Sequence, residues 1–157
     1  MEKTIVVAIN NSKARFFTLE EAEWPEYESG PNLVERESLC YSIEKSEKRA
    51  WFLINFKHHQ KSKEQKNSKK SFERKFAQKI IGEIVNLIRI YQGQKIILIA
   101  QPQILLLIRK FFTPTIFTHL TVQELPKDIS HFGRNQIHQY LAQKQFIPAY
   151  QKVFYPR

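Results

Sequence analysis

The chain has 157 residues, of which 42% are hydrophobic and 25% are charged, and its formal net charge is +10. This composition is typical of one globular domain and excludes an intrinsically disordered chain. The single cysteine, Cys40, excludes an intrachain disulfide and any metal site built from several cysteines.

The apolar stretches are short. The first, Thr4–Ile9, is too short for a signal peptide or a membrane span. The longest, 96–108, is interrupted by Gln101, Pro102 and Gln103. We therefore expect a cytoplasmic protein that makes no contact with a membrane.

Three segments rich in β-branched and aromatic residues predict the leading strands of an antiparallel sheet: 4–10, 14–19 and 33–43. The Asn-Asn-Ser sequence at 10–12 predicts a hairpin turn between the first two. The acidic, proline-containing segment 20–31 favours a surface loop. Residues 50–56 are either a continuation of that sheet edge or a further strand.

The positive charge is concentrated after these strands. Residues 57–79 contain nine Lys/Arg and only two acidic residues. Within them, 57–70 has no aliphatic side chain to bury, so we expect a mobile basic loop there.

Helical periodicity begins at Ser71, and apolar residues recur every three or four positions up to Tyr91. Gly93 follows where a helix commonly ends on a C′ glycine. The remaining expected elements are a buried strand at 95–100, a helix from Pro102 to about Phe112, a short strand at 116–122, a loop at 125–133 and a helix at 134–144.

This order predicts a single α/β domain over residues 1–145 and a loosely packed tail at 146–157. The fold class is a ribonuclease H-like mixed sheet of five or six strands. It combines an antiparallel leading hairpin with parallel strands and about three helices.

Four segments in this order resemble the bacterial host attachment protein family: 6–17, 72–77, 96–105 and 125–131. Residues 28–37 resemble its cyanobacterial branch, and the resemblance extends from about residue 4 to 145. The family is similar in fold to the middle domain of archaeal and eukaryotic peptide-chain release factors. This similarity implies a role at the ribosome, whereas the family name implies attachment to host cells.

The sequence departs from the family pattern at two places. Asn10 stands where most members carry Asp at the end of the first strand, and the basic segment 57–70 replaces a glycine-rich loop. A Gly-Gly-Gln tip is absent, which disfavours peptidyl-tRNA hydrolysis. Asp128 is the only aspartate, so a two-metal nuclease site is disfavoured too. We expect neither catalysis nor a bound metal or cofactor.

Two groups of residues are candidate binding sites. The first is basic and suits the phosphates of RNA or the ribosome: Lys61, Lys63, Lys66, Lys69, Lys70, Arg74 and Lys75. The second would form a polar cleft if the first hairpin turn lies near the 125–131 loop: Asn10, Asn11, Ser12, Lys13, Arg15, Asp128 and His131.

Two other functions fit the same sequence. A protein–protein adaptor would use the acidic segment 20–28 or the aromatic tail. A degenerate hydrolase would use Asn10 and Asp128. Oligomeric state does not follow from the sequence.

Overall fold

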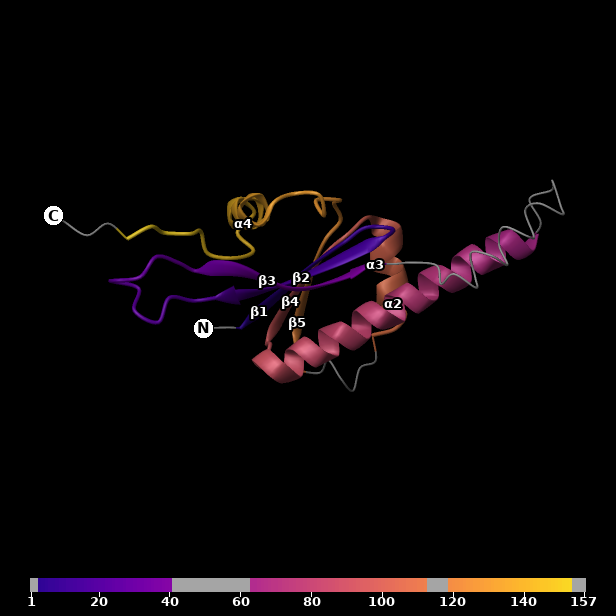
Figure 1. Ribbon diagram of the computed structural model, residues 1–157, viewed down its shortest axis with the longest axis horizontal. Coiled ribbons are helices and arrows are strands. Elements are labelled where there is room, and N and C mark those ends of the chain that lie inside the picture. The colour runs from indigo at the N-terminus through magenta and orange to yellow at the C-terminus, as the bar shows by residue number, and fades with distance from the viewer. Residues whose placement is uncertain (1–2, 41–62, 113–118, 154–157) are drawn as a thin grey trace.

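The computed structural model describes residues 3–40, 63–112 and 119–153, which form a five-stranded sheet between helical layers (Figure 1). In chain order the elements are β1 (Thr4–Ile9), β2 (Lys13–Glu20), β3 (Asn32–Cys40), α2 (Lys63–Tyr91), β4 (Lys95–Ile99), α3 (Pro102–Arg109), β5 (Thr121–Leu125) and α4 (Arg134–Gln143). The predicted α/β fold, with a mixed sheet of five strands and three helices, is confirmed.

The strand order in the sheet is β3-β2-β1-β4-β5. The leading strands pair antiparallel as predicted, and β4 is parallel to both β1 and β5. All six residues of β1 are buried, as are Ile96–Ile99 of β4. Helices cover both faces of the sheet, so nearly every residue of these two strands is buried. This burial explains why both strands have a nearly continuous apolar sequence.

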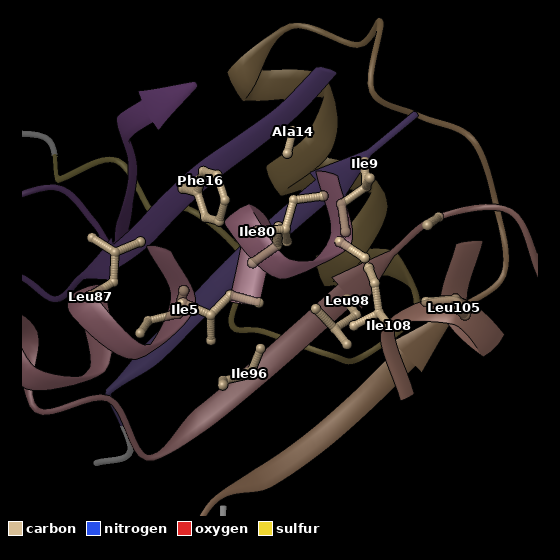
Figure 2. Packing of buried hydrophobic residues seen from close by; sticks show 14 of the residues in the cluster. Ile5, Ile9, Ala14, Phe16, Ile80, Leu87, Ile96, Leu98, Leu105 and Ile108 are labelled. Carbon is tan, nitrogen blue, oxygen red and sulfur yellow. The ribbon is translucent and has the colours of Figure 1, made fainter. Parts of the chain in front are cut away.

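The alternation of side chains along β1 divides the core into two layers. Ile5, Val7 and Ile9 pack under α2 and α3, together with Phe16 of β2 (Figure 2). On the opposite face the core continues under α4, with these members among others: Val6, Ala8, Phe17, Leu33, Ile137 and Leu141. The sheet therefore separates α2 and α3 from α4.

A β-bulge in β3 changes which of its residues face each layer. Phe16 pairs with Glu37 and Phe17 pairs with Glu35, so Arg36 is the extra residue. Without a bulge, Leu33 and Leu39 would face the same side, because they are six residues apart. Instead Leu33 packs under α4 and Leu39 packs on the α2 side.

The helix α2 begins at Lys63, eight residues before the predicted start at Ser71. The prediction of a loop is therefore wrong for residues 63–70, while 57–62 lie outside the described residues. The apolar periodicity could not reveal this part of the helix, because residues 63–70 contain no aliphatic side chain. Straight-chain Lys, Glu and Gln are nevertheless good helix formers.

The last strand also differs from its prediction. We expected it at 116–122, but β5 occupies Thr121–Leu125. Its position is set by pairing with β4, which aligns Ile97 with Gln123 and Ile99 with Leu125. Of the residues expected before it, 119 and 120 are not part of a strand, and 116–118 lie outside the described residues. The other expected strand segments, 41–43 and 50–56, lie outside the described residues.

The tail is attached to the domain more firmly than predicted. Ile147 is buried in the layer under α4, and the Nε2 atom of His138 lies 2.9 Å from the carbonyl oxygen of Pro148. Further on, Gln151 forms a β-bridge with Gly30. The expectation of loose packing is wrong for these residues, because Ile147 supplies an apolar anchor beyond the end of α4.

The end of α2 does not follow the predicted C′-glycine pattern. The left-handed residue is Gln92, with φ of 54°, and the N–H of Gly93 donates to the carbonyl of Ile88 at 3.2 Å. This bond pattern places Gly93 one position beyond the left-handed residue. A Cβ atom at Gly93 would lie 2.6 Å from Cδ1 of the buried Ile5, so close packing explains this glycine.

Replacing Gln92 with glycine should raise the free energy of unfolding by about 1 kcal/mol, because glycine adopts positive φ without steric cost. The matched control is Gln78→Gly, at an exposed position inside the same helix. This control should lower stability by about 1 kcal/mol. Urea denaturation measures both changes, and a loss of stability in Gln92→Gly would contradict the assigned helix end.

Candidate functional site

Asn10 directly follows β1 and organises the first hairpin turn. Its Oδ1 atom accepts hydrogen bonds from the backbone N–H groups of Ser12 and Lys13, at 2.9 and 2.7 Å. Its Nδ2 atom donates to the Oγ atom of Ser130 at 3.0 Å. One amide side chain thus closes the turn and reaches a residue 120 positions later in the chain.

Ser130 connects the two ends of the predicted cleft. Its hydroxyl donates to Oδ1 of Asp128 at 2.7 Å while accepting from Asn10, and the serine itself is buried. Asn10 and Asp128 are therefore brought together through a residue that the sequence analysis did not single out. Ser130 lies inside the 125–131 motif, and that position was the signal that could have identified it. We call Asn10, Asp128 and Ser130 the polar cluster.

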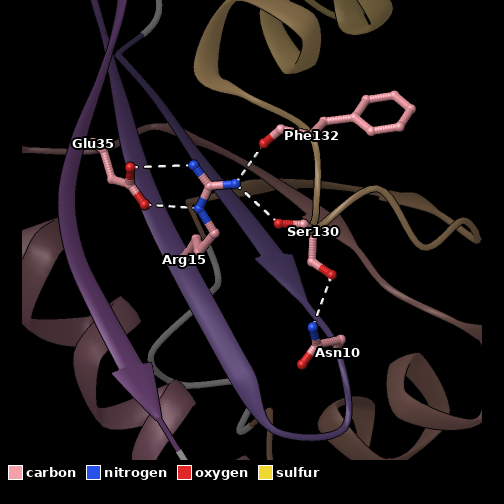
Figure 3. A network of polar contacts seen from close by, with 5 residues as sticks. All are labelled: Asn10, Arg15, Glu35, Ser130 and Phe132. Carbon is pink, nitrogen blue, oxygen red and sulfur yellow. Dashed lines mark hydrogen bonds and ion pairs between the residues drawn. The ribbon is translucent and has the colours of Figure 1, made fainter.

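Arg15 of β2 contacts the same loop through backbone carbonyl groups (Figure 3). Its Nη1 atom donates to the carbonyl oxygens of Ser130 and Phe132, at 2.9 and 2.6 Å. Its Nε and Nη2 atoms bind the two carboxylate oxygens of Glu35, at 2.8 and 3.2 Å. With only 13% of its side chain exposed, the guanidinium uses its donors on the protein itself.

The charge on Glu35 is stabilised by this arrangement. The pKa of Glu35 is lowered, mainly because Arg15 donates a hydrogen bond to its carboxylate. Partial burial opposes the shift, while the charges of Arg15, Lys13 and Arg134 add to it. The pair is ionic at neutral pH and links β3, through β2, to the loop before α4.

The structure places the other predicted cleft residues around the same turn and loop. Asn11 and Ser12 are exposed at the hairpin, and Lys13 is half-buried at the start of β2. His131 is exposed, and its ring contacts Phe132 edge-to-face at a centroid distance of 4.9 Å. Ser130 accepts a hydrogen bond from Asn10 through its hydroxyl and another from Arg15 through its carbonyl oxygen. The contacts thus fasten the loop over the ends of β1 and β2, and the use of these residues as a ligand cleft stays a prediction.

Six of the seven residues predicted to bind RNA lie in the first half of α2: Lys63, Lys66, Lys69, Lys70, Arg74 and Lys75. Lys61 lies outside the described residues. Arg74 and Lys75 are exposed, and Phe76 and Ala77, which follow them in the helix, are buried. The N-terminal half of α2 extends beyond the sheet (Figure 1), so the basic positions precede the part that packs on the core.

The described residues provide little else for chemistry. In the ranges 3–40, 63–112 and 119–153, no three His, Cys, Asp or Glu residues are grouped as metal ligands. Among the helices of the same ranges, none is both long and apolar enough to span a membrane.

Comparison with protein families gives one match over most of this fold. Residues 5–141 match the family described as "Protein required for attachment to host cells". The chain belongs to this host attachment family. The matched range begins in β1 and ends in α4, so it includes all of the sheet except Thr4, together with the polar cluster and α2. A comparison with curated proteins gave no match.

Asn10→Asp tests the hydrogen-bond chain in this member of the host attachment family. The change removes the donor to Ser130 and brings a second carboxylate towards Asp128, so it should cost about 1–2 kcal/mol of stability at pH 7. Asn11→Asp adds the same charge at the exposed neighbouring residue and should change stability by less than about 0.5 kcal/mol. Equal effects of the two changes in thermal denaturation would contradict the role of Asn10.

The Arg15–Glu35 pair predicts how stability depends on pH. Because the pKa of Glu35 is lowered, its contribution is present above the unfolded-state value of 4.5 and is lost as the pH falls through the folded-state pKa. Glu35→Gln should therefore lower stability at pH 7. The effect should be about 0.5–1 kcal/mol, because the carboxylate is partly exposed and solvent screens the pair.

Glu83 of α2 provides a control of opposite sign. Its pKa is raised by partial burial and by the charge of Glu37, so its ionisation at pH 7 opposes folding. Glu83→Gln should leave stability at pH 7 unchanged or raise it. Urea titrations at pH 7 and pH 4 measure both variants, and a stabilising Glu35→Gln substitution would refute the assignment of the pair.

Proposed function

We propose that this member of the host attachment family is a non-catalytic cytoplasmic binding module that contacts RNA, free or within the ribosome, through the basic half of α2. The observation that supports this proposal most strongly is the placement of Lys63, Lys66, Lys69, Lys70, Arg74 and Lys75 on one helix that extends beyond the sheet. A helix that packs along its whole length would present fewer of its residues to a partner.

The geometry of this helix suits a phosphate backbone. Residues 63–75 cover about 18 Å at the rise of an α-helix, which is long enough to follow several phosphates. Five of the six basic residues are lysines, which contact phosphates as point charges and do not form the bidentate fork of arginine. Such contacts position a nucleic acid without reading its bases. We therefore expect binding that depends on salt and little on sequence.

In this proposal the polar cluster has a structural role. Ser130 donates its hydroxyl proton to Asp128 and accepts a hydrogen bond from Asn10, so its hydroxyl joins the hairpin turn to the loop before α4. Arg15 is also engaged, with Glu35 and two carbonyl groups. These contacts explain the polar residues as parts that hold the loop in position.

Replacing Lys63, Lys66, Lys69 and Lys70 with Gln should weaken binding to a mixed RNA pool by at least tenfold at low salt. It should also reduce the slope of log Kd against log salt concentration by about 2–3, since each phosphate contact on a single strand contributes about 0.7. Filter retention at several salt concentrations measures both quantities.

The control variant removes the same charge elsewhere, by replacing four exposed lysines with Gln: Lys3, Lys110, Lys127 and Lys144. This variant should retain most of the affinity and the slope. Equal losses in the two variants would show that net charge alone attracts RNA, and unchanged binding by the α2 variant would refute the proposed interface.

A protein–protein adaptor is the second candidate function, and the segment between β2 and β3 supports it. Trp24 and Tyr27 are each 60% exposed on this acidic segment, where Glu28 accepts hydrogen bonds from the backbone of Glu23 and Trp24. Exposed Trp and Tyr are typical of binding hot spots. A stoichiometric protein partner that is retained after nuclease treatment and lost in a Trp24→Ala, Tyr27→Ala double variant would favour this function over RNA binding.

A further inference from the structure

A groove lies on the face of the sheet opposite α2, between α4 and the first residues of β3. Its volume is about 710 Å³, within the range of small-molecule sites. The α4 wall consists of one stripe of the helix: Arg134, Asn135, His138, Gln139, Ala142 and Gln143. The opposite wall is formed by Asn32 and Leu33 of β3 and by Ala149 and Tyr150 of the tail.

The fold constructs this groove from three separate segments. Ile137 and Leu141 fix α4 to the sheet, and the adjoining stripe of the helix is left facing the groove. The tail is held in place by the contact between His138 and the carbonyl of Pro148 and by the bridge between Gly30 and Gln151. Tyr150 lies between these two attachments, which fixes its backbone beside α4.

The polar groups that line the groove are mostly neutral, and the charge among them is positive. It includes four carboxamides, from Asn32, Asn135, Gln139 and Gln143, together with one guanidinium and no carboxylate. Within the described ranges, the side chains of Asn135, Gln139 and Gln143 form no hydrogen bond to the protein, so their donors and acceptors are available to a ligand. Glu35 lies near Arg134, but its charge is already paired with Arg15.

Three features of the lining define the ligand. Arg134 is the first residue of α4, where the helix dipole adds to its positive charge, so this end favours a phosphate. Carboxamides pair with the hydrogen-bonding edges of nucleobases. Tyr150, with half of its surface exposed, offers a ring on which a base can stack.

We propose that this groove binds a nucleotide, with its phosphate at Arg134, its base stacked on Tyr150 and the edge of the base facing the carboxamides of α4. The nucleotide is either free or one residue of an RNA strand. The site is independent of the proposed RNA contact, because α2 covers the other face of the sheet.

The test is calorimetric titration of the full chain with the four ribonucleoside monophosphates, the four nucleosides and inorganic phosphate. At least one monophosphate should bind more tightly than its nucleoside and more tightly than phosphate. Arg134→Gln and Tyr150→Ala should each weaken that binding by about tenfold. Arg89→Gln, at an exposed arginine in the last turn of α2, is the matched control and should leave it unchanged.

Short single-stranded oligonucleotides distinguish the two sources of the nucleotide. Tighter binding of an oligonucleotide, with the same loss in Arg134→Gln, would assign the groove to RNA, whereas tighter binding of the monophosphate would assign it to a free nucleotide. Thermal denaturation verifies that each variant is folded. The proposal is overturned if no monophosphate binds at millimolar concentration, or if Arg134→Gln behaves like Arg89→Gln.

Failure of this proposal is distinguishable from failure of the RNA interface. The variant with four glutamines in α2 should bind the monophosphate as the unmodified chain does, because its substitutions lie on the opposite face. A parallel loss of monophosphate binding in that variant would contradict a separate site.

Discussion

The interactions of Arg15 are the constraint on which the arrangement of this domain depends. One guanidinium on β2 binds the carboxylate of Glu35 on β3 and two carbonyl groups in the loop that precedes α4. Asn10 holds the same loop through Ser130. Because the loop starts at β5, on the far edge of the sheet, these contacts direct the chain back across the strand ends and place α4 over β1 and β2.

This placement gives the two faces of the sheet different surfaces. On one face, α2 covers the core with its second half, while its first half carries six basic residues beyond the sheet. On the other face, α4 and the tail form a groove with available carboxamides and one arginine. Arg15 and Asn10 direct their hydrogen bonds to the hairpin turn, to Glu35 and to the loop before α4, so they position the α4 side of the domain. The matched family covers all of these elements except the tail.

Most of the sheet could be predicted, because the residues of each strand and turn themselves carry the pattern that identifies it. Strands β1 and β4 are uninterrupted apolar runs, and the hairpin between β1 and β2 is marked by Asn10 and its neighbours. The position of β5 depends on pairing with β4 and could not be read from its own residues. Two further features depend in the same way on contacts between distant segments. The bulge at Arg36 decides which residues of β3 face each layer of the core, and the left-handed Gln92 precedes Gly93, which packs closely against Ile5 of β1. In the polar cluster, the sequence indicated the turn and the 125–131 loop, but the residue that joins them, Ser130, became visible only through a contact between distant segments.

Protection of individual lysines from acylation is the most direct test of the proposed contact between RNA and the basic half of α2. The protein is treated with an amine-reactive acetyl ester with and without saturating RNA, and the modification of each lysine is quantified by mass spectrometry. We expect Lys63, Lys66, Lys69 and Lys70 to be protected, whereas the exposed Lys110, Lys127 and Lys144 on other surfaces should react as they do in the free protein. Uniform protection of all lysines, or protection restricted to Lys127 and Lys144, would contradict it.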